Sequence, residues 1–74
     1  MAIDYDNLLT AEQKKAIVEN RLQQFATEAY QTELNKEIQI RQGDDLAVDA
    51  CNVSLSLIES AINVHQEELE KLDA

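Results

Sequence analysis

The stretch from residue 48 to residue 72, VDACNVSLSLIESAINVHQEELEKL, carries an uninterrupted seven-residue repeat. Positions at alternating spacings of three and four are apolar, apart from one histidine, which is the pattern of a helix that packs along one side. These positions are Val48, Cys51, Leu55, Ile58, Ile62, His65, Leu69 and Leu72. The opposite side is polar, with Asp49, Asn52 and Glu59 among its residues. The repeat therefore predicts an amphipathic helix that packs against a neighbour.

Capping signals divide the rest of the chain. Thr10 and Gln13 have the spacing of a capping box at the start of a helix, and Gly43, the only glycine, suits a left-handed cap at its end. Asp44 or Asp45 can then cap the next helix. The sequence has no proline to interrupt a helix. We expect one domain over 1–74. It consists of an arm at 1–9, helices at 10–42 and 45–72, and a turn at 43–44. The arm is expected to dock on the helices through Ile3, Tyr5, Leu8 and Leu9.

A turn this short makes the two helices antiparallel neighbours. The predicted fold class is all-α, an αα-hairpin of two long helices. Folding about the turn places Ile62 near Phe25, to within about one turn of helix. On the first helix the predicted seam consists of Val18, Leu22, Phe25 and Ala29. A second apolar row steps by four and drifts around the helix, so its C-terminal half should cross the partner helix at an angle or meet a different surface. This row is Leu22, Ala26, Tyr30, Leu34 and Ile38.

The apolar arc of the second helix is too wide for one neighbour. Leu57 and Val64 lie outside the seam, and covering them is worth about 3–5 kcal/mol, which is comparable with the whole stability of a small domain. We expect two hairpins to associate into a four-helix bundle, or the arc to dock on a different protein. The predicted interface consists of Ala50, Leu57, Ala61, Val64, Tyr30, Leu34 and Ile38.

The charge balance excludes some partners. Fifteen acidic and six basic residues give a formal charge of −9, which opposes binding to nucleic acid or to an anionic membrane. Such acidity serves solubility, or it lets a protein compete for a basic surface. The sequence has no apolar leader and no run of about 18 uncharged apolar residues, so neither secretion nor membrane spanning is expected. Cys51 cannot form an internal disulfide because it is the only cysteine, and it fits a reducing compartment.

Motifs for chemistry are few. His65 lacks the convergent partners of a catalytic or metal site, and Ile62 stands where the Glu-x-x-His pattern of di-iron bundles requires glutamate. We expect His65 to make a hydrogen bond near Arg21 or Glu28 across the hairpin. The Gly-Asp-Asp triplet at 43–45 lacks the ligand spacing of a calcium loop and is interpreted as a turn and cap. The sequence therefore predicts no enzyme, cofactor, metal site or small-molecule substrate.

The N-terminal half resembles a known group of proteins. The stretch from Asp4 to Lys36, DYDNLLTAEQKKAIVENRLQQFATEAYQTELNK, is similar to the start of short acidic proteins encoded by tailed phages of marine cyanobacteria. The likeness rests on LLTAEQKK and RLQQFATEAYQTELNK, and the second helix adds nothing to it. The resemblance implies a phage-encoded accessory protein in the host cytoplasm or the virion, and it transfers no functional residue.

Two functions fit these observations. The first is a non-enzymatic structural or interaction protein that self-associates, as a dimer, through the apolar face of the second helix. The alternative is an acidic binding protein that captures or inhibits a host protein, competing for a basic surface. Both predict a protein partner, which is a second copy in the first case.

Overall fold

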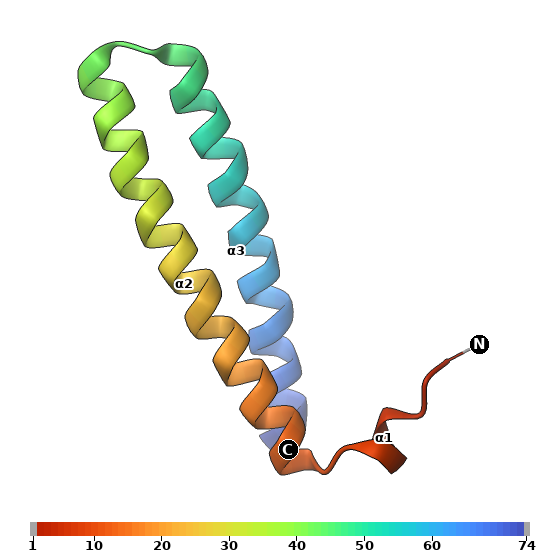
Figure 1. Cartoon of the computed structure of the whole chain (residues 1–74). Coiled ribbons are helices and arrows are strands. Elements are labelled where there is room, and N and C mark those ends of the chain that lie inside the picture. The colour runs from red at the N-terminus through yellow and green to blue at the C-terminus, as the bar shows by residue number, and fades with distance from the viewer. Residues whose placement is uncertain (1, 74) are drawn as a thin grey trace.

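The computed structural model describes residues 2–73, which form three helices (Figure 1). Helix α1 spans Tyr5–Leu8, α2 spans Ala11–Gln42 and α3 spans Asp45–Asp73. The long helices α2 and α3 run antiparallel and contact each other, which confirms the predicted all-α helical hairpin. Met1 and Ala74, the first residue of the predicted arm and the last of the predicted domain, lie outside the described residues.

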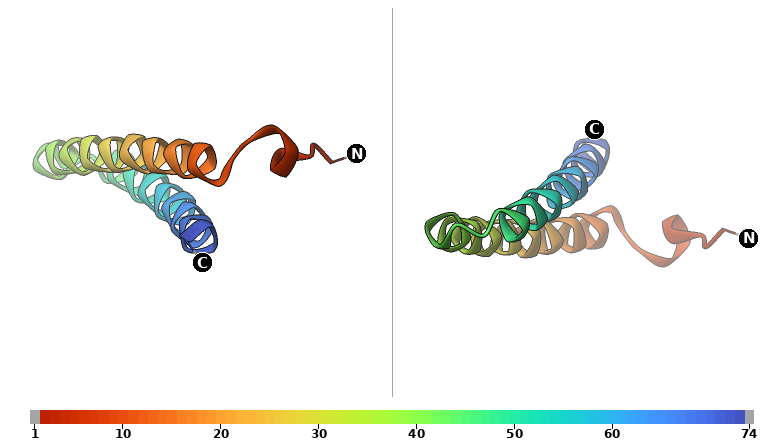
Figure 2. Two further views of the ribbon diagram at one scale, coloured as in Figure 1. Left: turned by 90° about the horizontal axis from the view of Figure 1, so that it is seen from below. Right: turned by 90° about the horizontal axis from the view of Figure 1, so that it is seen from above.

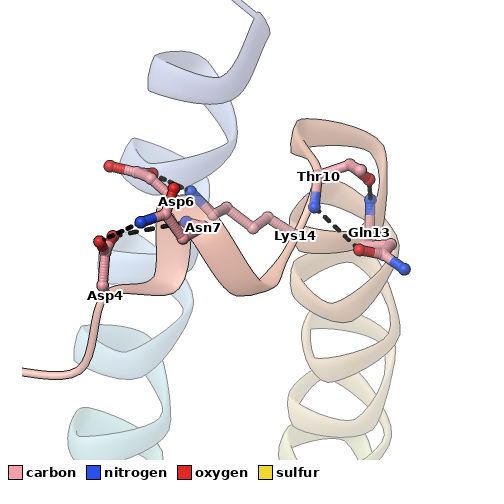
Figure 3. A network of polar contacts seen from close by, with 6 residues as sticks. All are labelled: Asp4, Asp6, Asn7, Thr10, Gln13 and Lys14. Carbon is pink, nitrogen blue, oxygen red and sulfur yellow. Dashed lines mark hydrogen bonds and ion pairs between the residues drawn. The ribbon is translucent and has the colours of Figure 1, made fainter.

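Helix α2 begins with the predicted capping box, which the structure confirms (Figure 3). The Gln13 amide donates to the Thr10 hydroxyl oxygen at 3.1 Å, and the Thr10 amide donates to the Gln13 side-chain oxygen at 2.8 Å. Two amide groups that a helix start leaves unpaired are therefore satisfied within four residues. This start is specified locally and needs no tertiary contact.

The turn between α2 and α3 depends on Gly43. Its backbone is left-handed, with φ of 74°, a conformation that costs a residue with a Cβ roughly 1–2 kcal/mol. The Gly43 amide donates to the Ile40 carbonyl and the Asp44 amide donates to the Gln39 carbonyl, each at 3.1 Å, which together form a Schellman motif. The Asp44 side chain then accepts from the Ala47 amide at 3.1 Å, so Asp44 caps α3.

The two long helices are inclined to one another. They lie side by side near the turn in Figure 1, and α3 passes behind α2 toward the open end, which is the end opposite the turn. Figure 2 shows the same inclination from below and from above. Two contacts fix their register. The rings of Phe25 and His65 have centroids 5.0 Å apart, and Lys15 forms an ion pair with Asp73 at 3.0 Å. His65 is three residues from Ile62, so the observed register agrees with the predicted one to within a turn.

The molecule is long and has little interior. It measures 52 × 25 × 17 Å, with a radius of gyration of 16.4 Å, whereas a compact domain of this length has about 11 Å. Among residues 2–73, Val18 is the only buried residue. Two helices form a single layer, so each helix keeps at least one side open to water.

Candidate interaction surface

The structure places all of the predicted seam residues between α2 and α3. Val18 is buried, and the others are half-buried on the facing sides of the two helices. On α2 these are Leu22, Phe25 and Ala29; on α3 they are Val48, Cys51, Leu55, Ile58, Ile62, His65, Leu69 and Leu72. We call this contact, with its continuation described next, the inner seam.

On α2 the inner seam continues through polar residues that the sequence analysis missed. Thr32, Lys36 and Gln39 are half-buried and extend the alternating spacing of four and three that begins at Val18. Because these residues are polar, hydrophobicity did not mark them as seam residues. Their spacing did mark them. The Thr32 hydroxyl donates to the Glu28 carbonyl at 2.8 Å, so its polar group is satisfied within its own helix.

His65 lies in the inner seam but differs from its predicted bonding. Its Nδ1 lies 2.6 Å from the Ala61 carbonyl oxygen, one turn earlier in α3, and its ring meets Phe25 edge to face at 67°. The Arg21 guanidinium lies 5.5 Å from the centroid of the Phe25 ring, within the range of a cation–π contact. His65 lies near Arg21 as predicted, but the hydrogen bond is made within α3 and not across the hairpin, because the ring satisfies one nitrogen on its own helix and packs on an aromatic neighbour.

The predicted interface residues of α3 lie outside the inner seam. Leu57 is 67% exposed and Val64 is 61% exposed, while Ala50 is exposed and Ala61 is half-buried. At the open end, Val64 and Ile17 line one groove of about 230 Å³, so the exposed side of α3 continues onto the neighbouring flank of α2. The apolar surface therefore extends beyond a single helix at this end.

Two further α3 residues complete a second repeat. Leu46 is 83% exposed and Val53 is 61% exposed, and the sequence analysis did not assign either of them. Together with four others they follow the same alternating spacing of four and three on the outer side of α3. We call this set the outer seam: Leu46, Ala50, Val53, Leu57, Ser60 and Val64. The spacing of these residues is visible in the sequence. Their role as a second surface becomes clear only once α2 is seen to cover the other side of α3.

The predicted interface residues of α2 do not share this surface. Tyr30, Leu34 and Ile38 are all exposed. Tyr30 directly follows the inner-seam residue Ala29, so it lies on one flank of α2. Ile38 directly precedes the inner-seam residue Gln39, so it lies on the other flank. Leu34, between them, lies on the side that faces away from α3. The C-terminal half of the drifting row is therefore exposed and not packed on α3; whether it meets a different surface stays a prediction.

The N-terminal arm is attached by one ion pair and one apolar residue. The Lys14 ammonium binds the Asp6 carboxylate (Figure 3), and this hydrogen bond, with the accompanying charge attraction, lowers the pKa of Asp6 below its usual value. Leu9 is half-buried. A cavity of about 470 Å³ lies between the arm, α2 and Glu68 of α3. Of the four predicted anchors, Ile3 and Tyr5 line this cavity but remain more than half exposed, and Leu8 is 68% exposed, so the arm packs on the helices more loosely than predicted.

The surface is more acidic than the net charge implies. All fifteen carboxylate side chains are exposed, whereas three of the six basic residues, Lys14, Lys15 and Lys36, are half-buried. Within residues 2–73, three carboxylates form ion pairs, those of Asp6, Glu37 and Asp73. The Asp73 partner raises the pKa of Lys15 through a hydrogen bond and charge attraction.

Neither long helix has a stretch apolar enough to cross a bilayer within residues 2–73. Over the same residues, no three side chains of histidine, cysteine, aspartate or glutamate come together in a way that could hold a metal ion. Comparison of the chain with protein-family models, with curated proteins and with solved structures found no match.

Proposed function

We propose that this chain is a non-enzymatic helical interaction protein that self-associates through the exposed apolar face of α3. The observation that supports the proposal is the outer seam, in which Leu57 is 67% exposed on a helix whose other side already contacts α2. Exposed contiguous apolar patches on small proteins mark interaction surfaces. Burial of such a face would also add to the stability of a hairpin that has one buried residue among residues 2–73.

The context that fits this proposal is a phage-encoded accessory protein. The resemblance of Asp4 to Lys36 to short acidic phage proteins supports it. In that setting the chain acts in the host cytoplasm or as a component of the virion. Detection of the chain by mass spectrometry in purified particles tests the virion location, and its absence from particles but presence in infected cells supports the host-directed one.

Self-association is tested by sedimentation velocity and light scattering with two adjacent variants. Leu57→Glu places a charge in the outer seam, while Ser56→Glu adds the same charge at the neighbouring exposed position on the polar side. A symmetric interface contains the change twice, so we expect Leu57→Glu to weaken dimerisation about 100-fold or more. Ser56→Glu should remain a dimer of twice 8.4 kDa. A wild-type chain that is monomeric at high micromolar concentration contradicts the proposal.

The exposure of every carboxylate favours a second candidate, an acidic module that captures a basic host protein. Attraction between opposite surface charges is screened by salt. Capture of a host protein by the immobilised chain should then fall steeply between 50 mM and 500 mM NaCl. Capture that is indifferent to salt but lost in Leu57→Glu points instead to apolar docking on α3.

A further inference from the structure

The outer seam has the dimensions of a helix-pairing surface. It begins at Leu46 and ends at Val64, a length of about 27 Å at 1.5 Å per residue. The two charged residues of α3 between its ends, Asp49 and Glu59, lie on the polar side. The next residue in the repeat is Glu67, so the apolar pattern stops after five turns.

The exposed area of the chain fits a second copy as the occupant. The chain exposes 5875 Å², whereas a compact protein of 8.4 kDa exposes about 4,600 Å². The excess of about 1,300 Å² is larger than the roughly 800 Å² that each partner buries in a standard protein interface. The outer seam contributes to this excess, since Leu46 is 83% and Leu57 is 67% exposed, and a second hairpin seated on it covers these side chains in both copies at once.

We propose that α3 pairs antiparallel with α3 of a second copy along the outer seam, with α2 on the outside of the dimer. This inference rests on the proposed self-association and adds its geometry. Side-chain size in the outer seam is symmetric about residue 55. Pairing about that point sets Leu46 against the second copy's Val64, Ala50 against its Ser60 and Val53 against its Leu57. A slip of one heptad in either direction leaves one end of the seam uncovered.

The helix dipoles favour the antiparallel direction, because two antiparallel dipoles oppose each other. In a parallel pair each residue meets its own copy, so Glu67 faces Glu67 and Lys71, which continues the outer seam after Val64, faces Lys71. Antiparallel pairing about residue 55 separates both like-charged pairs. It sets Glu67 level with Gly43 of the second copy, beside the positive end of that helix and next to Asp44 and Asp45, and it places Lys71 one turn farther out.

Disulfide trapping tests this geometry without large side-chain changes. In a Cys51→Ala background, Ala50→Cys and Ser60→Cys are made in separate chains, since both positions are exposed and small. Antiparallel pairing puts residue 50 opposite residue 60 of the second copy and leaves residue 50 about 15 Å from its own counterpart, too far for a disulfide. We expect oxidation of the mixed chains to give the 50–60 cross-link by mass spectrometry, and neither chain alone to cross-link.

The outcomes separate this inference from the proposed function. Cross-links of residue 50 to itself, or a dimer that gives no cross-link, overturn the antiparallel outer-seam pairing while self-association stands. A monomeric wild-type chain removes both. As a second measurement, Leu46→Glu and Val53→Glu should each weaken dimerisation at least 100-fold. Leu34→Glu, on the far side of α2, should leave the dimer intact, and dissociation by Leu34→Glu overturns the placement of α2.

Discussion

The hairpin can be divided into an open-end half, which holds the chain termini, and a turn half around Gly43. Both halves contribute to one continuous inner seam, but the α2 side chains in it are apolar in one half and polar in the other. In the open-end half, α2 contributes Val18, Leu22, Phe25 and Ala29, while in the turn half the same register brings in Thr32, Lys36 and Gln39. The large apolar residues in the C-terminal part of α2 point elsewhere: Tyr30, Leu34, Ile38 and Ile40 are exposed.

Once α2 is packed at one end, it sets the register of its other end. A straight helix continues its contact side whatever residues occupy it. Phe25, held between His65 and Arg21, therefore decides which residues of the turn half face α3. We infer that the open-end half supplies the stability of the hairpin, while the turn half is positioned by the Gly43 cap and the length of the connection.

The largest effect is expected from a charge in the apolar part of the inner seam. Ile58 is half-buried on the side of α3 that faces α2, and Ile58→Glu would leave an unpaired carboxylate there. Its cost approaches the whole free energy of unfolding of a domain this small, so we expect loss of the helical circular dichroism signal and of a cooperative melt.

The neighbouring change gives the matched control. Leu57→Glu alters the same helix one residue away, on the outer seam, and should dissociate the dimer while the helical signal largely persists. Equal loss of helical signal in Ile58→Glu and Leu57→Glu would show that the two sides of α3 have been misassigned.

A pair of alanine variants compares the two halves directly. Phe25→Ala removes a half-buried ring and should lower the free energy of unfolding by about 3 kcal/mol, the low end of the range for aromatic truncation. Gln39→Ala, at an equivalent position of the turn half, should change it by no more than about 0.5 kcal/mol. Urea denaturation followed by circular dichroism measures both, and comparable losses would refute the uneven distribution of stability.

Much of the fold could be predicted from the sequence, because the apolar repeat of α3 and the capping box at Thr10 are local signals. The register was predictable to within one turn for the same reason. Hydrophobicity could not reveal that Lys36 and Gln39 face α3, because both are polar, and their spacing became informative only once the packing of Phe25 and its neighbours had placed the seam. For the candidate interaction surface, Leu57 and Val64 could be predicted from the sequence as apolar residues outside the seam. Leu46 and Val53 could be assigned to the outer seam only when the position of α2 was known.

If the turn half is held in register without favourable packing, an apolar residue there should stabilise the hairpin. Lys36 is half-buried at an inner-seam position, and Lys36→Leu should raise the free energy of unfolding by about 1 kcal/mol, half the value of burying a leucine fully. The control is Glu33→Leu, which removes a charge from α2 at an exposed position and should have little effect. Destabilisation by Lys36→Leu, seen as a lower urea midpoint, would mean that the ammonium itself is required in the seam.

A similarly small effect is expected at the turn itself. A Cβ at Gly43 would meet no atom within 4 Å, so Gly43→Ala carries only the backbone cost of the left-handed conformation, about 1 kcal/mol. Gly43→Asn should cost less, because asparagine adopts this conformation more readily than alanine. Thermal unfolding of both variants measures the difference. If Gly43→Ala instead destabilises the hairpin as much as Phe25→Ala, then the turn half depends on more than its cap, and the stability of the two halves is coupled through the connection.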